Sequence, residues 1–397
     1  MFNVIKIEKK EKCSGCSACM ASCPVHCIEM KEDEEGFYYP VANEKTCKNC
    51  GRCERVCPIF MKSHAEQEIK GAYAIVSKDT EERLMSSSGG VFSLLAKEVL
   101  SEGGVVFGAA MANDWKSVNH VVIKKDIDLN LLRGSKYVQS KIGDAYLQAQ
   151  KYLDKGRKVL FTGTPCQIGG LRQFLNRDYK NLYLQDIICH GVPSTYAWEE
   201  YVNFREKKVA STTKKVLFRH KKYGWKTYSV LFKYSNGTEY DRVHGEDLYI
   251  KIFLDNYDLR PSCYNCAFKH LERHSDITLA DLWGAQDMTP ELDDNKGVSL
   301  AIVHSEKGER LLANISDKII TQEVPLHQAI SHNTSMIESE VRPPERDDFY
   351  NDLKELGFQG IEKKYYPMTV KQKVIRWLRG TKRELLYRSK NKLWERK

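Results

Sequence analysis

The sequence lacks the segments that carry a chain into or across a membrane. Its longest apolar stretches, such as Gly103 to Ala112, have about ten residues, whereas a helix that spans a bilayer needs about 20. Met1 to Lys12 contains no apolar segment like that of a secretory signal. We therefore expect a cytoplasmic protein whose 13 cysteines stay reduced and act as metal ligands or catalytic thiols.

Two further absences narrow the function. No G-x-G-x-x-G fingerprint is present, so the sequence gives little support for nicotinamide binding. Most of the chain carries no net charge. The total is +9, and Pro367 to Lys397, with eleven Lys or Arg and two Asp or Glu, accounts for all of it. The neutral remainder argues against a nucleic-acid-binding protein with structural metal clusters, because binding to phosphates needs a basic surface.

One cysteine motif, C-x2-C-x2-C-x3-C-P, occurs twice in the first 60 residues, with a shift of 34 residues between the copies. In this ferredoxin spacing, three close thiolates bind one 4Fe-4S cluster and the fourth reaches the other cluster. A zinc site usually has ligand pairs separated by a longer loop, so two complete copies favour iron–sulfur. One cluster is therefore assigned to Cys13, Cys16, Cys19 and Cys57, and the other to Cys47, Cys50, Cys53 and Cys23. Cys27 falls outside the pattern and is interpreted as a small buried apolar residue.

The rest of the chain alternates strand-like and helix-like segments, which predicts an α/β fold, α+β overall, with some parallel strand pairing. Strands are expected at 72–76, 105–110, 121–123, 158–161 and 182–188, and helices at 91–100, 144–153 and 167–175. From Val216 to Tyr240, alternating β-branched and aromatic residues with a turn at Asn236-Gly237 predict an antiparallel insertion. The expected domains are a dicluster ferredoxin domain (1–62), an α/β body (70–340) and a C-terminal segment (341–397), with a linker from Met61 to Lys70.

Four more cysteines lie in the body. Cys166 follows one predicted strand and Cys189 follows the next, and open α/β sheets bind their ligands at such carboxyl ends. Cys263 and Cys266 form an isolated C-x2-C pair. The four could hold a third cluster, but their spacing alone leaves open a zinc site, or two inert buried cysteines with a surface pair.

Six short motifs are spread over the body. They are Ser87-Ser88-Gly89-Gly90, Gly134-Ser135-Lys136-Tyr137, Gly163-Thr164-Pro165-Cys166-Gln167, Cys189-His190-Gly191, the C-x2-C at Cys263, and Asp276 to Gly284. With them the chain resembles, from Cys13 to Val303, the coenzyme F-420 hydrogenase/dehydrogenase beta-subunit family fused to a dicluster ferredoxin. The resemblance implies an oxidoreductase that uses flavin adenine dinucleotide (FAD) beside a 4Fe-4S cluster, the third cluster being held by Cys166, Cys189, Cys263 and Cys266.

The resemblance also implies partners. Electrons would pass between the clusters, a redox protein such as a ferredoxin, and a small-molecule two-electron carrier or substrate. Similar bacterial proteins often accompany surface polysaccharide synthesis, which suggests a link to that process. The alternative is a non-catalytic electron-transfer subunit of a larger complex.

The resemblance places the flavin against three stretches of the body. The expected contacts are Ser87, Ser88, Gly89 and Gly90 before a helix, Thr162, Gly163 and Thr164 after a strand, and the cation of Lys136 near the flavin ring. Glycines before a helix let backbone N–H groups approach a pyrophosphate. The ordinary alternatives are a simple helix cap for the first stretch and a solvated lysine for Lys136.

The basic tail has helical spacing. Its mostly apolar stripe consists of Val370, Val374, Trp377, Leu378, Thr381 and Leu385. A basic amphipathic helix of this kind is typical of peripheral contact with a membrane surface, here the cytoplasmic face. Two alternatives remain open: a solvated or body-docked basic end, and binding to a nucleic acid or an acidic partner.

Overall fold

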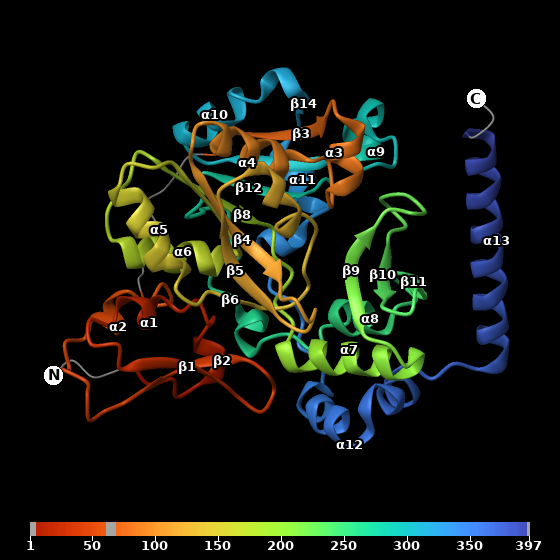
Figure 1. The fold of residues 1–397 in the computed structure, drawn as a ribbon, viewed down its shortest axis with the longest axis horizontal. Coiled ribbons are helices and arrows are strands. Elements are labelled where there is room, and N and C mark those ends of the chain that lie inside the picture. Colours follow the sequence, from red (N-terminus) through yellow and green to blue (C-terminus); the bar gives the residue numbers. More distant parts are fainter. Residues whose placement is uncertain (1–4, 61–68, 395–397) are drawn as a thin grey trace.

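The computed structural model describes residues 5–60 and 69–394, so most of the predicted linker, residues 61–68, lies outside the described part of the chain. Figure 1 shows a small N-terminal unit beside a larger body, with the last helix standing at the opposite edge. The N-terminal unit contains α1 (Ala18–Ser22), α2 (Arg52–Arg55) and an antiparallel hairpin of β1 (Ile28–Glu32) and β2 (Tyr38–Ala42).

The body is built on a nine-stranded mixed sheet. In spatial order its strands are β14 (Ile319–Glu323), β3 (Gly71–Ser77), β13 (Ser299–Val303), β12 (Ile277–Asp281), β8 (Leu182–Ile187), β7 (Val159–Thr162), β4 (Val105–Met111), β5 (Val118–Ile123) and β6 (Ser140–Lys141). The run β12-β8-β7-β4 is parallel, and most other pairs are antiparallel. This arrangement confirms the mixed α/β class that the alternating pattern predicted.

The helices cover both faces of this sheet. They are α3 (Thr80–Met85), α4 (Val91–Ser101), α5 (Ala145–Asp154), α6 (Pro165–Leu175), α9 (Ala285–Met288), α10 (Glu306–Ala313) and α11 (Leu326–Ser331). Along β7, Val159 and Phe161 pack into the core under α5 and α6, while Leu160 packs into the core under α4. Because both faces of a central parallel strand are covered, its sequence is a continuous apolar run.

A second, three-stranded antiparallel sheet has the order β11 (Glu239–Val243), β10 (Ser229–Tyr234), β9 (Thr213–His220). The Asn236-Gly237 turn joins β10 to β11, as the sequence predicted, with Gly237 at φ +83°. The sheet packs with α7 (Thr195–Val209), α8 (Leu248–Leu254) and α12 (Arg346–Tyr365) around the buried Trp198. Phe349 of α12 shares this core, so residues on both sides of the boundary expected near Val341 pack together.

The last helix is α13 (Val370–Trp394), which lies beside β9–β11 (Figure 1). Within residues 5–60 and 69–394, none of the helices combines the length and the hydropathy that crossing a bilayer requires.

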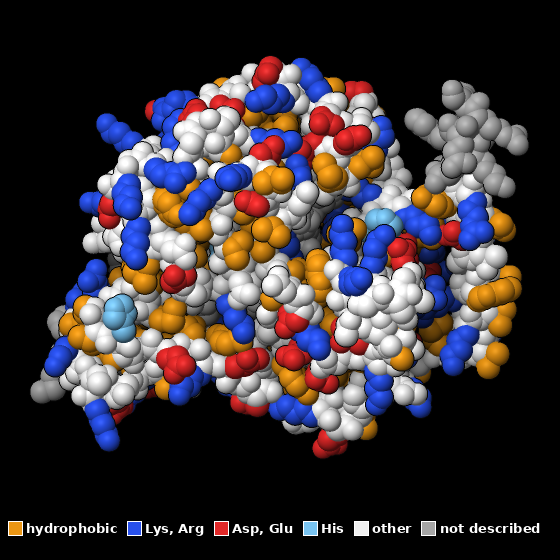
Figure 2. Space-filling view, in the orientation of Figure 1, with side chains coloured by type: hydrophobic (Ala, Val, Ile, Leu, Met, Phe, Trp, Pro, Cys, Tyr) orange, Lys and Arg blue, Asp and Glu red, His pale blue; other side chains and the backbone are white. Residues whose placement is uncertain are grey.

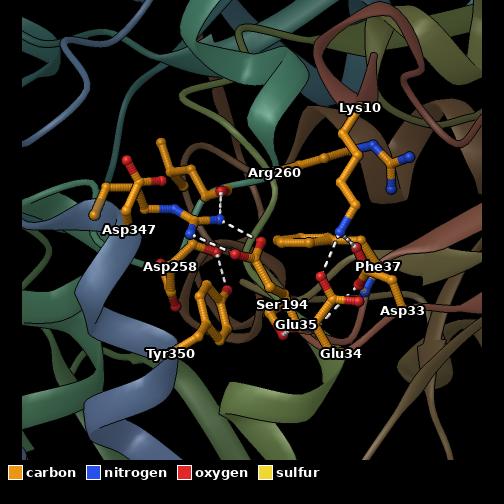
Figure 3. A network of polar contacts seen from close by, with 12 residues as sticks. Lys10, Asp33, Glu34, Glu35, Phe37, Ser194, Asp258, Arg260, Asp347 and Tyr350 are labelled. Carbon is orange, nitrogen blue, oxygen red and sulfur yellow. Dashed lines mark hydrogen bonds and ion pairs between the residues drawn. The ribbon is translucent and has the colours of Figure 1, made fainter. Parts of the chain in front are cut away.

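Buried arginines join the N-terminal unit to the body. Arg346 forms two hydrogen bonds with the Glu35 carboxylate, at 2.9 and 2.8 Å, and a third with the Leu259 carbonyl at 3.0 Å. Figure 3 shows Glu35, Ser194, Asp258 and Tyr350 gathered at this junction. Ser194 donates to the Glu35 carbonyl, so side chains from several segments fix the β1–β2 turn on the body.

Asp258 is an unusual member of this junction. Its side chain is fully buried, and neither carboxylate oxygen has a hydrogen-bond partner among the described residues. Burial raises its pKa from 3.8 to about 7, although the nearby charge of Arg346 acts in the opposite direction. The folded protein therefore binds a proton here that the unfolded chain releases between about pH 4 and pH 7.

Replacing this carboxyl group should change the pH dependence of stability. Because the folded pKa is raised, the wild-type protein loses stability as the pH rises from about 4 to about 7. The stability of Asp258→Asn relative to wild type should increase by roughly 1 to 3 kcal/mol between pH 5 and pH 8. Anaerobic urea unfolding at the two pH values measures this difference. Asp178→Asn, with a side chain 95% exposed, is the control, and an equal trend in both variants would contradict the assignment.

Candidate functional site

The first set of predicted ligands comes together in the N-terminal unit. Burial raises the pKa of Cys19, and the adjacent thiolates of Cys16, Cys13 and Cys57 raise it further. These four thiols are therefore electrostatic neighbours, and a cluster that binds thiolates would relieve their repulsion. The arrangement fits the set that the motif assigned to one cluster.

The second set surrounds its own cavity in the same unit. The lining includes the four predicted ligands Cys23, Cys47, Cys50 and Cys53. Cys27 lines this cavity too, with its Sγ 3.4 Å from the Sγ of Cys23. Cys27 is buried as expected, but it also lies within contact of a predicted ligand, which its position four residues after Cys23 could have indicated.

The two cysteine loops repeat in conformation as well as in sequence. Gly15 and Ser17 have φ values of +70° and +65°, and the residues 34 positions later, Asn49 and Gly51, have +51° and +66°. This left-handed conformation turns the chain sharply at alternate residues, and Gly and Asn adopt it most readily. The backbone therefore wraps around the thiols of both loops in the same way.

The four body cysteines line one cavity of about 350 Å³. Cys166 lies in the first turn of α6, just after β7, and Cys189 follows β8, so neighbouring parallel strands deliver both to one edge of the sheet. Cys263 lies in the short helix η3 (Pro261–Asn265), and Cys266 directly follows it. The topology thus brings together four thiols that are up to 100 residues apart in sequence.

The electrostatics of this cavity suit a bound cation or cluster. Burial raises the pKa of Cys166 to about 11 and that of Cys263 to about 12, and the neighbouring thiolates contribute to both shifts. The cations of Lys269 and Arg273 also line the cavity and oppose the charge of bound thiolates. Four soft sulfur donors with basic side chains behind them fit a 4Fe-4S cluster.

A mononuclear metal site is less well matched. Among the residues that the structure describes, no three or more His, Cys, Asp or Glu side chains are grouped as the ligands of a single ion. Zinc would need four ligands in a tight tetrahedron, whereas these thiols are distributed around a cavity.

Helix α6 brings the body cavity next to the first cluster set. Gly170 packs so closely on the Cys16 side chain that a Cβ at this position would lie 3.0 Å from the Cys16 Sγ. The buried Tyr146 hydroxyl lies near both cysteine sets. Burial raises its pKa most, and the charges of Cys16 and Cys166 raise it further. The Cys16 side chain therefore meets α6 one helix turn after Cys166.

The stretches expected to contact a flavin lie near one another. The Ser87 and Ser135 hydroxyls are 2.9 Å apart, which joins the Ser87–Gly90 loop to the loop that carries Lys136. The third stretch is connected through His120, whose Nε2 is 2.9 Å from the Thr162 carbonyl. Burial lowers the pKa of His120, the hydrogen bond to Thr162 opposes this, and the Lys136 charge makes a smaller lowering contribution.

Lys136 itself is not free to approach a ligand. Its ammonium group donates three hydrogen bonds to the carbonyls of Leu131, Leu132 and Arg133, at 2.9 to 3.0 Å. Burial lowers its pKa to about 7. Lys136 is therefore not a solvated lysine. Its hydrogen bonds cap the carboxyl end of the short helix at 126–131 and so hold the loop at 132–137 in place.

Several basic and aromatic groups beside the Ser87–Gly90 loop were not assigned to the flavin site from the sequence. Lys221 donates to the Ser88 carbonyl at 2.9 Å. Arg219 lies 2.9 Å from Asp281 and packs over Tyr228. Figure 2 shows the surface hollowed between the main sheet and β9–β11, with Lys and Arg side chains on its rim. The basic run at 219–222 was visible in the sequence, but its proximity to Ser88 depends on how the two sheets pack.

Two family models match the chain. Residues 12–60 match the 4Fe-4S dicluster domain, and residues 156–328 match the C terminus of the coenzyme F420 hydrogenase/dehydrogenase beta subunit. The resemblance drawn from the motifs is thus confirmed for these two segments, and the chain is an iron–sulfur oxidoreductase-type subunit related to that beta subunit. No curated protein matches the chain.

Chains of several solved structures are similar to this one, and one of them illustrates the likeness. A chain of the F420-reducing [NiFe] hydrogenase complex from Methanosarcina barkeri, studied by xenon derivatization, has 16% sequence identity and a TM-score of 0.47. The alignment covers 75% of the present chain and 91% of that chain.

Iron content tests the third cluster. Four cysteines per cluster predict about twelve irons per chain in anaerobically purified protein. Cys166→Ala should lower this by about four, because it removes one ligand from the body cavity. Ser229→Ala, which removes a buried hydroxyl from β10 that lines neither cysteine cavity, is the control and should leave iron unchanged. Unchanged iron in Cys166→Ala would show that the body cysteines hold no cluster.

The contact between α6 and Cys16 can be tested by adding one methyl group. Gly170→Ala would push against the Cys16 sulfur and increase the distance between the two sites. We expect unchanged iron content but several-fold slower electron transfer between the clusters, with weaker magnetic coupling in paramagnetic resonance spectra. Gly380→Ala is the control, since nothing lies within 4 Å of that position. Equal rates in both variants would mean that this contact does not set the separation.

Proposed function

We propose that this protein is a flavin-dependent iron–sulfur oxidoreductase that passes electrons between its ferredoxin-type clusters and a two-electron carrier or substrate. The observation that carries the proposal is the contact of Gly170 with Cys16, which places the body cavity directly beside the N-terminal cluster set. When bound, the clusters supply single-electron transfer, and a flavin supplies the ability to hold one or two electrons.

The second cysteine set of the N-terminal unit lies where a protein electron donor or acceptor could bind. Cys50 is exposed, whereas Cys16 and Cys19 are buried, so the second cluster set lies nearer the surface. The exposed Lys48 and Arg52 flank Cys50 and give this edge a positive charge. Such a rim favours an acidic redox partner such as a ferredoxin, because complementary charge speeds association.

The Ser87–Gly90 loop is arranged to receive an anionic group. Gly90, at φ +93°, begins α4 without a side-chain cap, so the first backbone N–H groups of an 11-residue helix have no side-chain acceptor. Helix N-termini of this kind bind phosphates. Gly89 has no room for a side chain, because a Cβ would lie 2.2 Å from the Ile75 carbonyl oxygen. These features support a pyrophosphate of FAD at this loop.

Lys221 positions the same loop. Its amino group donates to the carbonyls of Arg83, Ser88 and Lys296, at 2.6 to 2.9 Å, and so ties the loop to two other segments. Burial lowers the pKa of Lys221 to about 7. The turn at Thr162–Thr164 connects this region to the cysteine cavity, since the Thr164 hydroxyl lies 3.1 Å from the Cys166 sulfur. In this proposal the flavin lies between the turn and the loop, within reach of the third cluster site.

The alternative function is a non-catalytic electron-transfer subunit that only relays electrons to a partner enzyme. A link to surface polysaccharide synthesis depends on resemblance alone and would define the substrate class. Reduction assays distinguish both possibilities from the main proposal. In these assays deazaflavin, nicotinamide and sugar-linked acceptors are offered to the flavin-loaded protein. Flavin content without reduction of any acceptor would favour the relay subunit.

Flavin binding is the central prediction. Anaerobic protein with intact clusters should bind one FAD, and Lys221→Gln should weaken binding at least tenfold, because the loop loses the three hydrogen bonds that hold it in place. Lys226→Gln, in the same β9–β10 connection but paired with Asp293 at the surface, should bind FAD normally. Fluorescence titration measures the affinities, and iron analysis checks that each variant is folded. Cluster-loaded wild-type protein that fails to bind FAD would refute the proposal.

A further inference from the structure

The C-terminal helix α13 is attached to the body along one face only. Glu384 accepts hydrogen bonds from Lys222 and Tyr223, both at 2.8 Å, on the connection between β9 and β10. Arg383 pairs with Glu246 at 2.9 Å, just after β11. In Figure 1 this helix runs beside the three-stranded sheet, at the edge of the molecule opposite the N-terminal unit.

The opposite face of α13 presents a row of apolar side chains to solvent. Their exposed fractions are 50% for Val374, 67% for Trp377, 54% for Leu378 and 62% for Leu385. Residues at i, i+4 and i+11, such as Val374, Leu378 and Leu385, lie on one side of a helix, and here that side is opposite to Arg376 and Arg383. Figure 2 shows hydrophobic side chains along the outer edge of this helix.

Positive charges flank this stripe. Lys371, Arg379, Lys382 and Arg388 are all exposed. Glu384 is the one acidic residue between Val370 and Ser389, and it is held against the body. Apart from Glu384, which is 31% exposed and also lies 3.1 Å from Arg388, the outward face of α13 combines apolar and basic groups.

We propose that α13 docks the protein on the surface of an anionic lipid membrane, with the Val374–Leu385 stripe in the interfacial layer and the basic residues against the lipid headgroups. Charge decides between the occupants. A second copy would bring an equally basic helix against this one, whereas an anionic leaflet attracts every exposed Lys and Arg of the face. Trp and Leu beside Lys and Arg are typical of helices that lie in the plane of a membrane.

The docking geometry makes this contact compatible with the folded body. The side of α13 that binds Glu246, through Arg376 and Arg383, is opposite to Val374, Leu378 and Leu385, so the helix can meet a flat surface without leaving the body. The inference is independent of the flavin, since none of these residues belongs to the cysteine cavity or to the Ser87–Gly90 loop.

Sedimentation with vesicles tests the proposal on the full, cluster-loaded chain. Wild type should pellet with vesicles of equal parts phosphatidylglycerol and phosphatidylcholine, and at least tenfold less with phosphatidylcholine alone or in 0.5 M salt. The double variant Leu378→Glu/Leu385→Glu should lose at least tenfold of the anionic-vesicle binding. Ile127→Glu/Ile320→Glu changes two exposed apolar residues elsewhere by the same charge and should bind as wild type does.

Iron content equal to wild type shows that each variant is folded. Absence of wild-type binding to the anionic vesicles, or equal losses in the two double variants, would overturn the proposal. Sedimentation velocity without lipid gives the third readout. Self-association that Leu378→Glu/Leu385→Glu abolishes would assign the stripe to a second copy and also overturn it.

Discussion

One buried side chain fixes the relation between the two halves of this molecule. Arg260 donates to the carbonyl of Cys13 at 2.7 Å and to the carbonyl of Tyr38 at 3.0 Å, and it immediately precedes the helix that carries Cys263. A single guanidinium thus joins the first cysteine loop to the third cysteine set. Electron transfer depends steeply on separation, so the proposed function requires a connection that does not slide.

The connection is rigid because the Arg260 guanidinium is buried and is held by several hydrogen bonds. Arg260 is completely buried, also bonds to Gln139 at 3.1 Å, and stacks 4.2 Å above the Tyr39 ring. Removing one partner of such a buried donor leaves it without a hydrogen bond, which typically costs about 1 to 3 kcal/mol and more for a charged group. Arg346, a second buried arginine of the body, binds the Glu35 carboxylate in the β1–β2 turn. The N-terminal unit is therefore held by directional polar bonds in addition to apolar contact.

The sequence predicted the parts of this architecture that depend on local pattern. The apolar run at Val159–Thr162, the Asn236-Gly237 turn and the repeated cysteine spacing each carry their structural meaning within a few residues. Arg260 and Arg346 carry no such signal, because their partners Cys13 and Glu35 lie 247 and 311 residues away. Lys136 shows the same limit, since the carbonyls that receive its hydrogen bonds become available only where a short helix ends. Periodicity and spacing identify elements and ligand sets, whereas tertiary packing decides which charges become buried.

The close packing of Gly170 on Cys16 also constrains how the protein is made. With α6 packed against the first cysteine loop, Cys16 is only 8% exposed, and Gly170 of this helix lies against its sulfur. A scaffold that delivers preassembled iron–sulfur cores needs direct access to this thiol. A cluster bound by this set would therefore have to enter before α6 packs against the loop, or from the side on which Cys13 and Cys57 stay partly exposed.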